Sequence, residues 1–215
     1  HRMTAPRRLS TLAFGRRLAA QLDGGAKLAE VLERPQIPPI LDVMDDNEGA
    51  TFFLIGPVQA GKSAIGQIRV LRNHWVRPRP VLWYGLTGDF IKEFAVTKLN
   101  PLFDACSEMQ AIITRGDGAR TRNAKDAKIL AGGGSHLLLS MATENDRTGK
   151  TGCDIYRDES HLMESGWMAQ TSNRRANYPE EFTELDMSTG LIAGTDAAAG
   201  WARSNQLTWH CRCPE

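Results

Sequence analysis

The feature that most constrains this chain is a glycine-rich loop between a strand pattern and a helix pattern. Residues 51–55 form a continuous apolar run, typical of a buried strand, and residues 63–74 have helical periodicity. Between them lies a full Gly-x4-Gly-Lys-Ser pattern, made of Gly56, Pro57, Val58, Gln59, Ala60, Gly61, Lys62 and Ser63. The N–H groups of such a loop, and the helix that follows it, attract phosphate. The pattern predicts a nucleotide site in which Lys62 reaches the β- and γ-phosphates and Ser63 is a ligand of Mg²⁺.

The order of a strand followed by a helix recurs along the chain. Strand patterns occur at residues 81–84, 137–141, 154–157 and 183–187, and a helical pattern follows the first of them at residues 89–99. Alternating strands and helices predict an α/β fold with a mostly parallel sheet flanked by helices. With the glycine-rich loop, this is the P-loop NTPase fold of the RecA/ASCE-like kind.

The amino-terminal part is predicted to be a short helical segment. Leucines recur at three or four residues between residues 7 and 33, with a break at Gly24 and Gly25, and the prolines of residues 35–39 cannot continue a helix. We therefore predict a helical segment at 1–34 and a P-loop ATPase domain at 35–215. The opening His1 and Arg2 read as vector residues before a start methionine, Met3, and the chain closes just after a strand-like run at residues 207–211. We expect a domain excised from a longer protein.

Composition indicates the cellular compartment of the chain and the partners that it can bind. The 26 Lys and Arg residues nearly balance the 25 Asp and Glu residues, giving a net charge of +1, so a nucleic acid would have to bind a local patch. No run of 18 apolar residues and no secretory signal occurs in the sequence. The 4 cysteines are too few for a disulfide scaffold. These features predict a cytosolic protein with reduced thiols and no membrane segment.

An acidic pair follows the strand pattern at residues 154–157. Asp158 and Glu159 stand about 100 residues after the glycine-rich loop, where a P-loop enzyme needs carboxylates at a strand end. Asp158 is expected to hold Mg²⁺ through water, and Glu159 to act as the base that positions the attacking water. The alternative is an exposed acidic pair at the start of a helix.

The acidic pair also favours one class of nucleotide enzyme over others. The segment Asn123, Ala124, Lys125 and Asp126 has the wrong order for the guanine-reading Asn-Lys-x-Asp of common GTPases. Small-molecule kinases usually lack a Glu beside the Asp. A water-activating pair therefore favours an ATPase that converts hydrolysis into motion.

From about residue 35 to residue 215 the chain resembles the ATPase domain of the large terminase subunit of tailed bacteriophages, most closely its lambda-like branch. The resemblance rests on a series of segments in one order: residues 59–63, 81–84, 88–90 and 100–103, then Arg147, Lys150 and Asp154, then Asp158 and Glu159, then residues 188–190 and 209–214. It implies ATP hydrolysis, with ATP and Mg²⁺ as cofactors, that translocates double-stranded DNA into a procapsid.

The resemblance also implies a coupling motif, partners and a location. Ser188, Thr189 and Gly190 match the motif that contacts the γ-phosphate and transmits its release to the DNA-binding parts of the protein. Without the resemblance, the alternative for these three residues is a simple turn. The implied partners are double-stranded DNA, the portal protein, the small terminase subunit and further copies of this chain in a ring, all in the host cytoplasm. The family's nuclease domain would lie beyond Glu215.

One departure from the family concerns the positive charge needed in the transition state. Many terminases carry an Arg inside the loop, at the position of Val58 here. The charge must then come from elsewhere, and the candidates are Arg147, Arg174, Arg175 or a neighbouring subunit. Arg147 is the first choice for a catalytic arginine because it precedes the acidic pair. The alternative is a solvated surface arginine.

A polar segment at residues 115–128 is the main candidate for weak DNA binding. It is expected to be a surface loop or hairpin-like excursion whose cations contact phosphates: Arg115, Arg120, Arg122, Lys125 and Lys128. The alternative is a solvated loop without a ligand.

The sequence thus predicts the ATPase motor domain of a DNA-packaging terminase. Two alternatives remain open at this point. One is another DNA-associated P-loop ATPase, of the helicase or repair kind. The other is a nucleotide-dependent switch that binds ATP without turnover, for which Glu159 would have no use.

Overall fold

The sheet follows the predicted α/β design. The computed structural model describes residues 9–22, 25–113 and 126–208, whose six strands form one sheet in the order β1-β6-β5-β2-β4-β3. The strands are β1 (Ala50–Ile55), β2 (Pro80–Gly85), β3 (Ala127–Ile129), β4 (Ser135–Ser140), β5 (Asp154–Arg157) and β6 (Thr183–Ser188). Every neighbouring pair is parallel except β3 with β4. The predicted mostly parallel sheet is confirmed.

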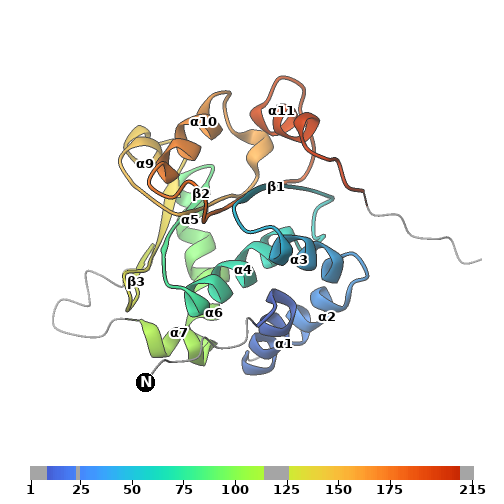
Figure 1. Cartoon of the computed structure of the whole chain (residues 1–215), viewed down its shortest axis with the longest axis vertical. Helices are drawn as coiled ribbons and strands as arrows, with labels where there is room; N and C mark the ends of the chain where they lie inside the picture. The colour runs from blue at the N-terminus through green and yellow to red at the C-terminus, as the bar shows by residue number, and fades with distance from the viewer. Residues whose placement is uncertain (1–8, 23–24, 114–125, 209–215) are drawn as a thin grey trace, which may run out of the picture.

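Helices cover both faces of this sheet. They are α1 (Thr11–Gln21), α2 (Ala26–Glu33), α3 (Ile37–Asp46), α4 (Lys62–Val76), α5 (Gly88–Phe94), α6 (Asn100–Ala105), α7 (Ser107–Ile112), α9 (Glu144–Thr148), α10 (Trp167–Ser172) and α11 (Asp196–Arg203). Figure 1 shows α1, α2 and α3 in blue beside α4, and α9, α10 and α11 in yellow to red on the opposite side of the molecule. Across the described ranges, no helix has the length and apolar character that crossing a bilayer requires.

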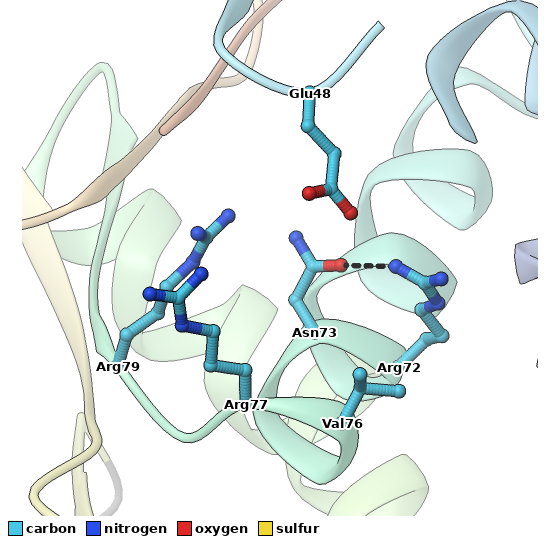
Figure 2. Close-up of a pocket in the computed structure, with 6 residues that line it drawn as sticks. All are labelled: Glu48, Arg72, Asn73, Val76, Arg77 and Arg79. Atoms are coloured by element: carbon cyan, nitrogen blue, oxygen red, sulfur yellow. Dashed lines mark hydrogen bonds between the residues drawn. The ribbon is translucent and has the colours of Figure 1, made fainter. Parts of the chain in front are cut away.

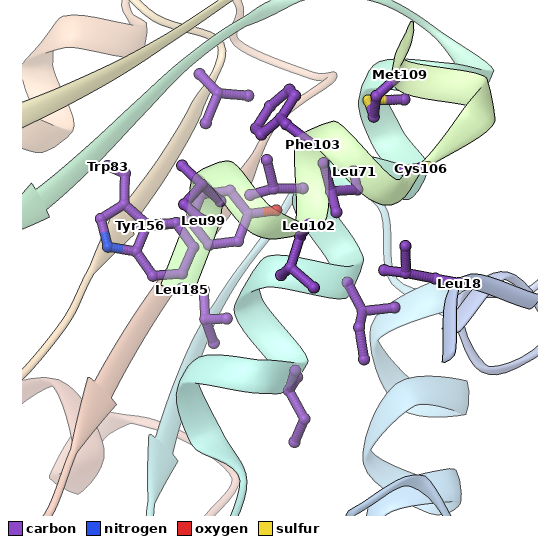
Figure 3. Close-up of a cluster of buried hydrophobic side chains, with 14 of the residues drawn as sticks. Leu18, Leu71, Trp83, Leu99, Leu102, Phe103, Cys106, Met109, Tyr156 and Leu185 are labelled. Carbon is purple, nitrogen blue, oxygen red and sulfur yellow. The ribbon is translucent and has the colours of Figure 1, made fainter. Parts of the chain in front are cut away.

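Alternate residues of β2 supply the cores on the two faces of the sheet. Val81 and Trp83 belong to the larger cluster, together with side chains of α4 and α6, whereas Leu82 and Tyr84 belong to a smaller cluster on the other face. The Trp83 ring stacks on Tyr156 of β5, with ring centroids 5.3 Å apart, in the part of the larger cluster shown in Figure 3. Because β2 is buried on both faces, it fixes the centre of the sheet.

The amino-terminal helices pack onto the same larger cluster. Phe14 and Leu18 of α1, Leu32 of α2 and Leu41 of α3 are at most 1% exposed and join the cluster that contains Leu71 of α4. The predicted helical pair at the amino terminus is present as α1 and α2. The division at residues 34 and 35 remains a prediction, and the shared core shows that the two parts pack as neighbours.

The prolines of residues 35–39 do not continue α2, as predicted, and a new helix begins among them. They separate α2 from α3, and Pro38 and Pro39 lie in the first turn of α3. A proline there removes no intrahelical hydrogen bond, because the first N–H groups of a helix have no partner in the helix.

Three strand expectations also need adjustment. β1 was expected to be buried on both faces, but it is half-buried and has one neighbour, β6, among the described residues. Within the segment 115–128, residues 115–125 lie outside the described residues, and Ala127 and Lys128 at its end belong to β3, which pairs with β4. In the strand-like run at 207–211, Leu207 and Thr208 are not in a strand and the rest lies outside the described residues.

Candidate nucleotide site

The glycine-rich loop joins β1 to α4 at the carboxyl edge of the sheet. Gly61 has φ +93°, a conformation that side chains disfavour, and a Cβ there would lie 2.8 Å from Cγ1 of Val31. The N–H of Gly56 donates to the carbonyl of Ser188 at 3.1 Å, which ties the loop to the end of β6. The loop therefore has a fixed shape that depends on both α2 and β6.

Lys62 points back into the curve of this loop. Its Nζ donates to the carbonyl oxygens of Gly56 at 2.9 Å and of Pro57 at 2.8 Å, and the residue is 7% exposed. An ammonium in this position presents its charge where the loop N–H groups converge, as expected of the lysine of a P-loop.

Asp158 lies against the first turn of α4. Its carboxylate accepts a hydrogen bond from Oγ of Ser63 at 3.0 Å, and its own N–H donates to the carbonyl of Tyr84 at 3.0 Å. Burial raises the pKa of Asp158 to about 6, although the Ser63 hydrogen bond acts to lower it. A buried carboxylate and a hydroxyl are oxygen donors of the kind that Mg²⁺ prefers, so these two residues fit the expected metal site.

Glu159 is held by a residue that follows β6 and by a residue of the turn that Glu159 itself begins. Its carboxylate Oε2 accepts a hydrogen bond from Oγ1 of Thr189 at 2.7 Å and lies 3.5 Å from Nδ1 of His161. Its backbone is left-handed, with φ +53°, which is uncommon for a residue with a side chain and is found where surrounding structure enforces it. The predicted base therefore has a defined orientation, to which the predicted coupling residue contributes directly.

The strand order brings these groups together. β6 lies between β1 and β5 and is parallel to both, so the carboxyl ends of all three strands meet at one edge. Ser188 pairs with Ile55, the last residue before the loop, and its Oγ donates to the carbonyl of Gly190. The motif at residues 188–190 thus emerges between the glycine-rich loop and the acidic pair.

A buried ion network lies directly behind the acidic pair. Arg157 is fully buried, and its guanidinium pairs with Asp186 at 3.0 Å and with Glu184 at 2.6 Å, both on β6. Arg175, which follows α10, pairs with Glu184 at 3.0 Å. The two arginines and two carboxylates balance, as burial of charge requires. The network fixes β5, β6 and the α10 region relative to one another.

A cavity of about 570 Å³ opens beside the loop, within the usual range for small-molecule sites. Residues of the loop and of α4 line one side, together with Glu159. The other side is made by residues that the sequence reasoning missed: Lys27, Glu30, Val31, Arg34 and Lys98. No motif marks these residues, because their position depends on how α2 and the π-helical turn Ala95–Leu99 pack against the loop.

Arg147 is engaged elsewhere at the same edge of the sheet. Its guanidinium donates to the carbonyl of Met141 and to Oε1 of Gln170, and it lies over the Trp167 ring, 4.6 Å from the centroid. It is not among the residues that line the cavity beside the loop. A catalytic role for Arg147 remains a prediction and would require these contacts to change.

Most of the predicted DNA-binding residues cannot be placed. Arg115, Arg120, Arg122 and Lys125 lie outside the described residues, whereas Lys128 lies on β3, opposite His136 of β4. Burial lowers the pKa of Lys128, and Asp104 and Asp126 oppose that shift.

A second, much smaller hollow of about 60 Å³ lies at the opposite, amino edge of the sheet (Figure 2). All three of its arginines have partners: Arg79 pairs with Asp154 at 2.8 Å, Arg77 pairs with Glu181, and Arg72 donates to the carbonyl of Leu9 at 2.9 Å and to Oδ1 of Asn73 at 3.2 Å. The size and the paired charges make this hollow unsuitable for a nucleotide.

The fold and the site define the class of P-loop nucleotide-binding domains: a mostly parallel sheet, a Gly-x4-Gly-Lys-Ser loop between a strand and a helix, and an acidic pair at a nearby strand end. The sequence matches the family described as "Phage terminase large subunit gpA, ATPase domain" over residues 29–215. The chain belongs to this family. Among curated proteins, no sequence matches it.

The chain also aligns with solved structures, and one of them shows the same fold. The large terminase of bacteriophage HK97 aligns with a TM-score of 0.59 at 13% identity, over 91% of this chain and 40% of that one. The large terminase of a thermophilic bacteriophage aligns with a TM-score of 0.48 at 16% identity, and its complex with ADP at 0.48 and 17%, each over 76% of this chain and 38% of that one. The chain spans about two fifths of the length of these proteins.

Proposed function

We propose that this chain is the motor domain of a DNA-packaging terminase and that its ATPase site is the cavity beside the glycine-rich loop. The observation that carries the site assignment is the convergence of Lys62, Ser63, Asp158, Glu159 and Thr189 at one edge of the sheet. Ser63 donates to Asp158 and Thr189 donates to Glu159 across segments, and Lys62 donates to carbonyls of its own loop, so the group is held in place by hydrogen bonds.

The contacts support a distinct role for each residue. Lys62 would bind the phosphates of ATP, and Ser63 with Asp158 would hold Mg²⁺, which neutralises charge on the polyphosphate. Glu159 would take the proton of the attacking water, because Thr189 holds its carboxylate in place. Thr189 directly follows β6. A movement of Glu159 on loss of the γ-phosphate would therefore be transmitted to β6 through the hydrogen bond between Thr189 and Glu159. This is a physical basis for coupling by residues 188–190.

The wider assembly is part of the same proposal. Family membership supports double-stranded DNA, the portal protein and the small terminase subunit as partners, and a ring of further copies, in the host cytoplasm. The basic residues of segment 115–128 would add weak phosphate contacts that several subunits sum. We expect no DNA cleavage by this chain, and the arginine for the transition state is Arg147 or a residue from a neighbour.

The test is ATP turnover across protein concentration, with and without long double-stranded DNA. We expect turnover per chain to rise with protein concentration and with DNA, since an arginine supplied by a neighbour contributes about 10³- to 10⁵-fold in rate. Lys62→Met is the inactive control. Binding of Mg·ATP without turnover at any concentration, DNA included, would favour a nucleotide-dependent switch and contradict the motor assignment.

A further inference from the structure

Arg34 connects the amino-terminal helices to the glycine-rich loop. It follows α2 directly, and its Nη1 donates to the carbonyl of Gln59, 25 residues further along the chain, at 2.5 Å. Its Nη2 lies 3.4 Å from a carboxylate oxygen of Glu30, and the side chain is 32% exposed. The guanidinium is thus held at the tip of the loop while part of it faces open space.

The loop itself lacks a second cation. Between Gly56 and Lys62 it contains Pro57, Val58, Gln59, Ala60 and Gly61, so Lys62 supplies its one side-chain charge. Gln59 has φ +61°, and the 72% exposed Val58 precedes it. The carbonyl of Gln59 points out of the loop toward Arg34, which places a guanidinium where the loop has no charge of its own.

The cavity wall formed with Arg34 is positively charged. Four cations line the cavity, namely Lys27, Arg34, Lys62 and Lys98, against two carboxylates, Glu30 and Glu159. An excess of two positive charges in a partly enclosed space attracts a polyphosphate. Three of the four cations come from outside the glycine-rich loop and α4.

We propose that Arg34 is a phosphate-binding residue of the nucleotide site, which reaches the polyphosphate from the connection between α2 and α3. The guanidinium has five N–H donors in a planar fork, so one side of it keeps the Gln59 carbonyl while the other binds phosphate oxygens. The role rests on the proposed ATPase function and adds to it a cation supplied within the same chain. It also means that the position of α2 decides how well the site binds a triphosphate.

The test compares variants that separate charge from support of the loop. Arg34→Gln keeps an N–H donor for the Gln59 carbonyl but removes the charge, and Arg34→Lys keeps the charge but loses the fork. Arg16→Gln is the matched control, because Arg16 forms an exposed ion pair with Glu33 at 3.0 Å on the same pair of helices. The measurement is calorimetric titration of each protein with Mg·ATP and with AMP, after thermal unfolding confirms equal folding.

The expected result is a loss of affinity that is larger for the triphosphate than for the monophosphate. Arg34→Gln should weaken binding of ATP by about tenfold or more and binding of AMP by less than about twofold, since a hydrogen bond to a charged group is lost with the triphosphate alone. Arg34→Lys should fall between Arg34→Gln and the unchanged protein, and Arg16→Gln should match the unchanged protein.

Two results would overturn the role of Arg34. One is an unchanged affinity of Arg34→Gln for ATP, and the other is an equal loss for ATP and AMP, which would make Arg34 a support for the loop. The variant Lys62→Met distinguishes a failure of the Arg34 inference from a failure of the proposed function. If Lys62→Met loses affinity for ATP while Arg34→Gln keeps it, only the inference about Arg34 fails. If the unchanged protein does not bind ATP, the proposed function fails as well.

Discussion

Glu159 shows how one side chain of this site is controlled by its neighbours. Its left-handed backbone turns the carboxylate back toward β6, where the Thr189 hydroxyl donates to it, and His161 lies close to the same oxygen. A base held in this way loses little freedom when a water molecule has to be aligned. The orientation of Glu159 therefore depends on the turn that it begins and on Thr189 after β6, and not on the acidic pair alone.

Removal of the Thr189 hydroxyl tests this orientation. Thr189→Val keeps the shape of the side chain but removes the donor, so we expect ATP turnover to fall by about tenfold to a hundredfold, the effect of a lost hydrogen bond to a charged group. Affinity for ATP should change by less than about twofold, since the lost contact is to the base. Steady-state kinetics and calorimetric titration measure the two quantities. Thr97→Val is the control, because that hydroxyl bonds the Glu93 carbonyl on an exposed helix; equal turnover in both variants would refute the role.

At the scale of elements, the buried ion network holds the strands that carry the acidic pair and the coupling motif. Arg157 is the last residue of β5, and its partners Glu184 and Asp186 alternate along β6 on one face. A shift of β6 would therefore have to move Arg157, whose neighbour is Asp158. The network is a rigid support behind the site.

Arg157→Met should destabilise the fold strongly. It leaves two buried carboxylates without their main partner, which costs about 3–5 kcal/mol in the free energy of unfolding. Arg16→Met, which breaks an exposed pair with Glu33, should cost less than about 1 kcal/mol. Urea unfolding measures both. A loss below about 1 kcal/mol for Arg157→Met would show that the network does not support β5 and β6.

The elements also show what the sequence can and cannot predict. The loop at residues 56–63 was recognisable from its motif and the strand at 81–84 from its apolar run. The strands at 154–157 and 183–187 contain charged residues, and each directly precedes a short candidate motif, the acidic pair or residues 188–190. β3 was not recognised, because a strand of three residues is too short to show a periodic pattern in the sequence. Its pairing depends on β4, which follows it in the chain. Lys98 and Arg34 were missed for a related reason, since their approach to the cavity depends on packing between helices.

At the scale of the whole molecule, a pair of histidines occupies the larger core. His74 of α4 and His136 of β4 are at most 1% exposed, and their ring nitrogens lie 3.2 Å apart, beside Phe103 of α6. Burial, assisted by the charge of Arg79, lowers the pKa of His74 to about 3. Burial, assisted by His74 and by Lys128, lowers the pKa of His136 well below 6.5. Both rings are therefore neutral in the folded protein at neutral pH.

This pair should make the fold sensitive to acid. The unfolded chain takes up protons on these rings near pH 6.5, so the free energy of unfolding falls as the pH drops below about 6.5. His74, with its pKa of about 3, contributes about 2 kcal/mol of this loss at pH 5, and His136 acts in the same direction. Asp158 and Asp186, whose pKa values burial raises to about 6, act in the opposite direction.

His74→Gln isolates the contribution of one ring. Its amide can still donate to His136, and one titrating group is removed, so the loss of stability between pH 7.5 and pH 5 should shrink by about 2 kcal/mol. Urea unfolding at several pH values measures the change. Parallel curves for the variant and the unchanged protein would mean that the buried pair does not set the acid response.

The fold as a whole brings the glycine-rich loop, the acidic pair and the Thr189 hydroxyl together at one edge of the sheet. The central claim is that this site hydrolyses ATP with Glu159 as the base. The most direct measurement is ATP turnover by Glu159→Gln set against its affinity for Mg·ATP. We predict a fall in turnover of about 100-fold or more with affinity within about twofold, because the amide keeps the size of the side chain but cannot take a proton. Unchanged turnover in Glu159→Gln would contradict the account.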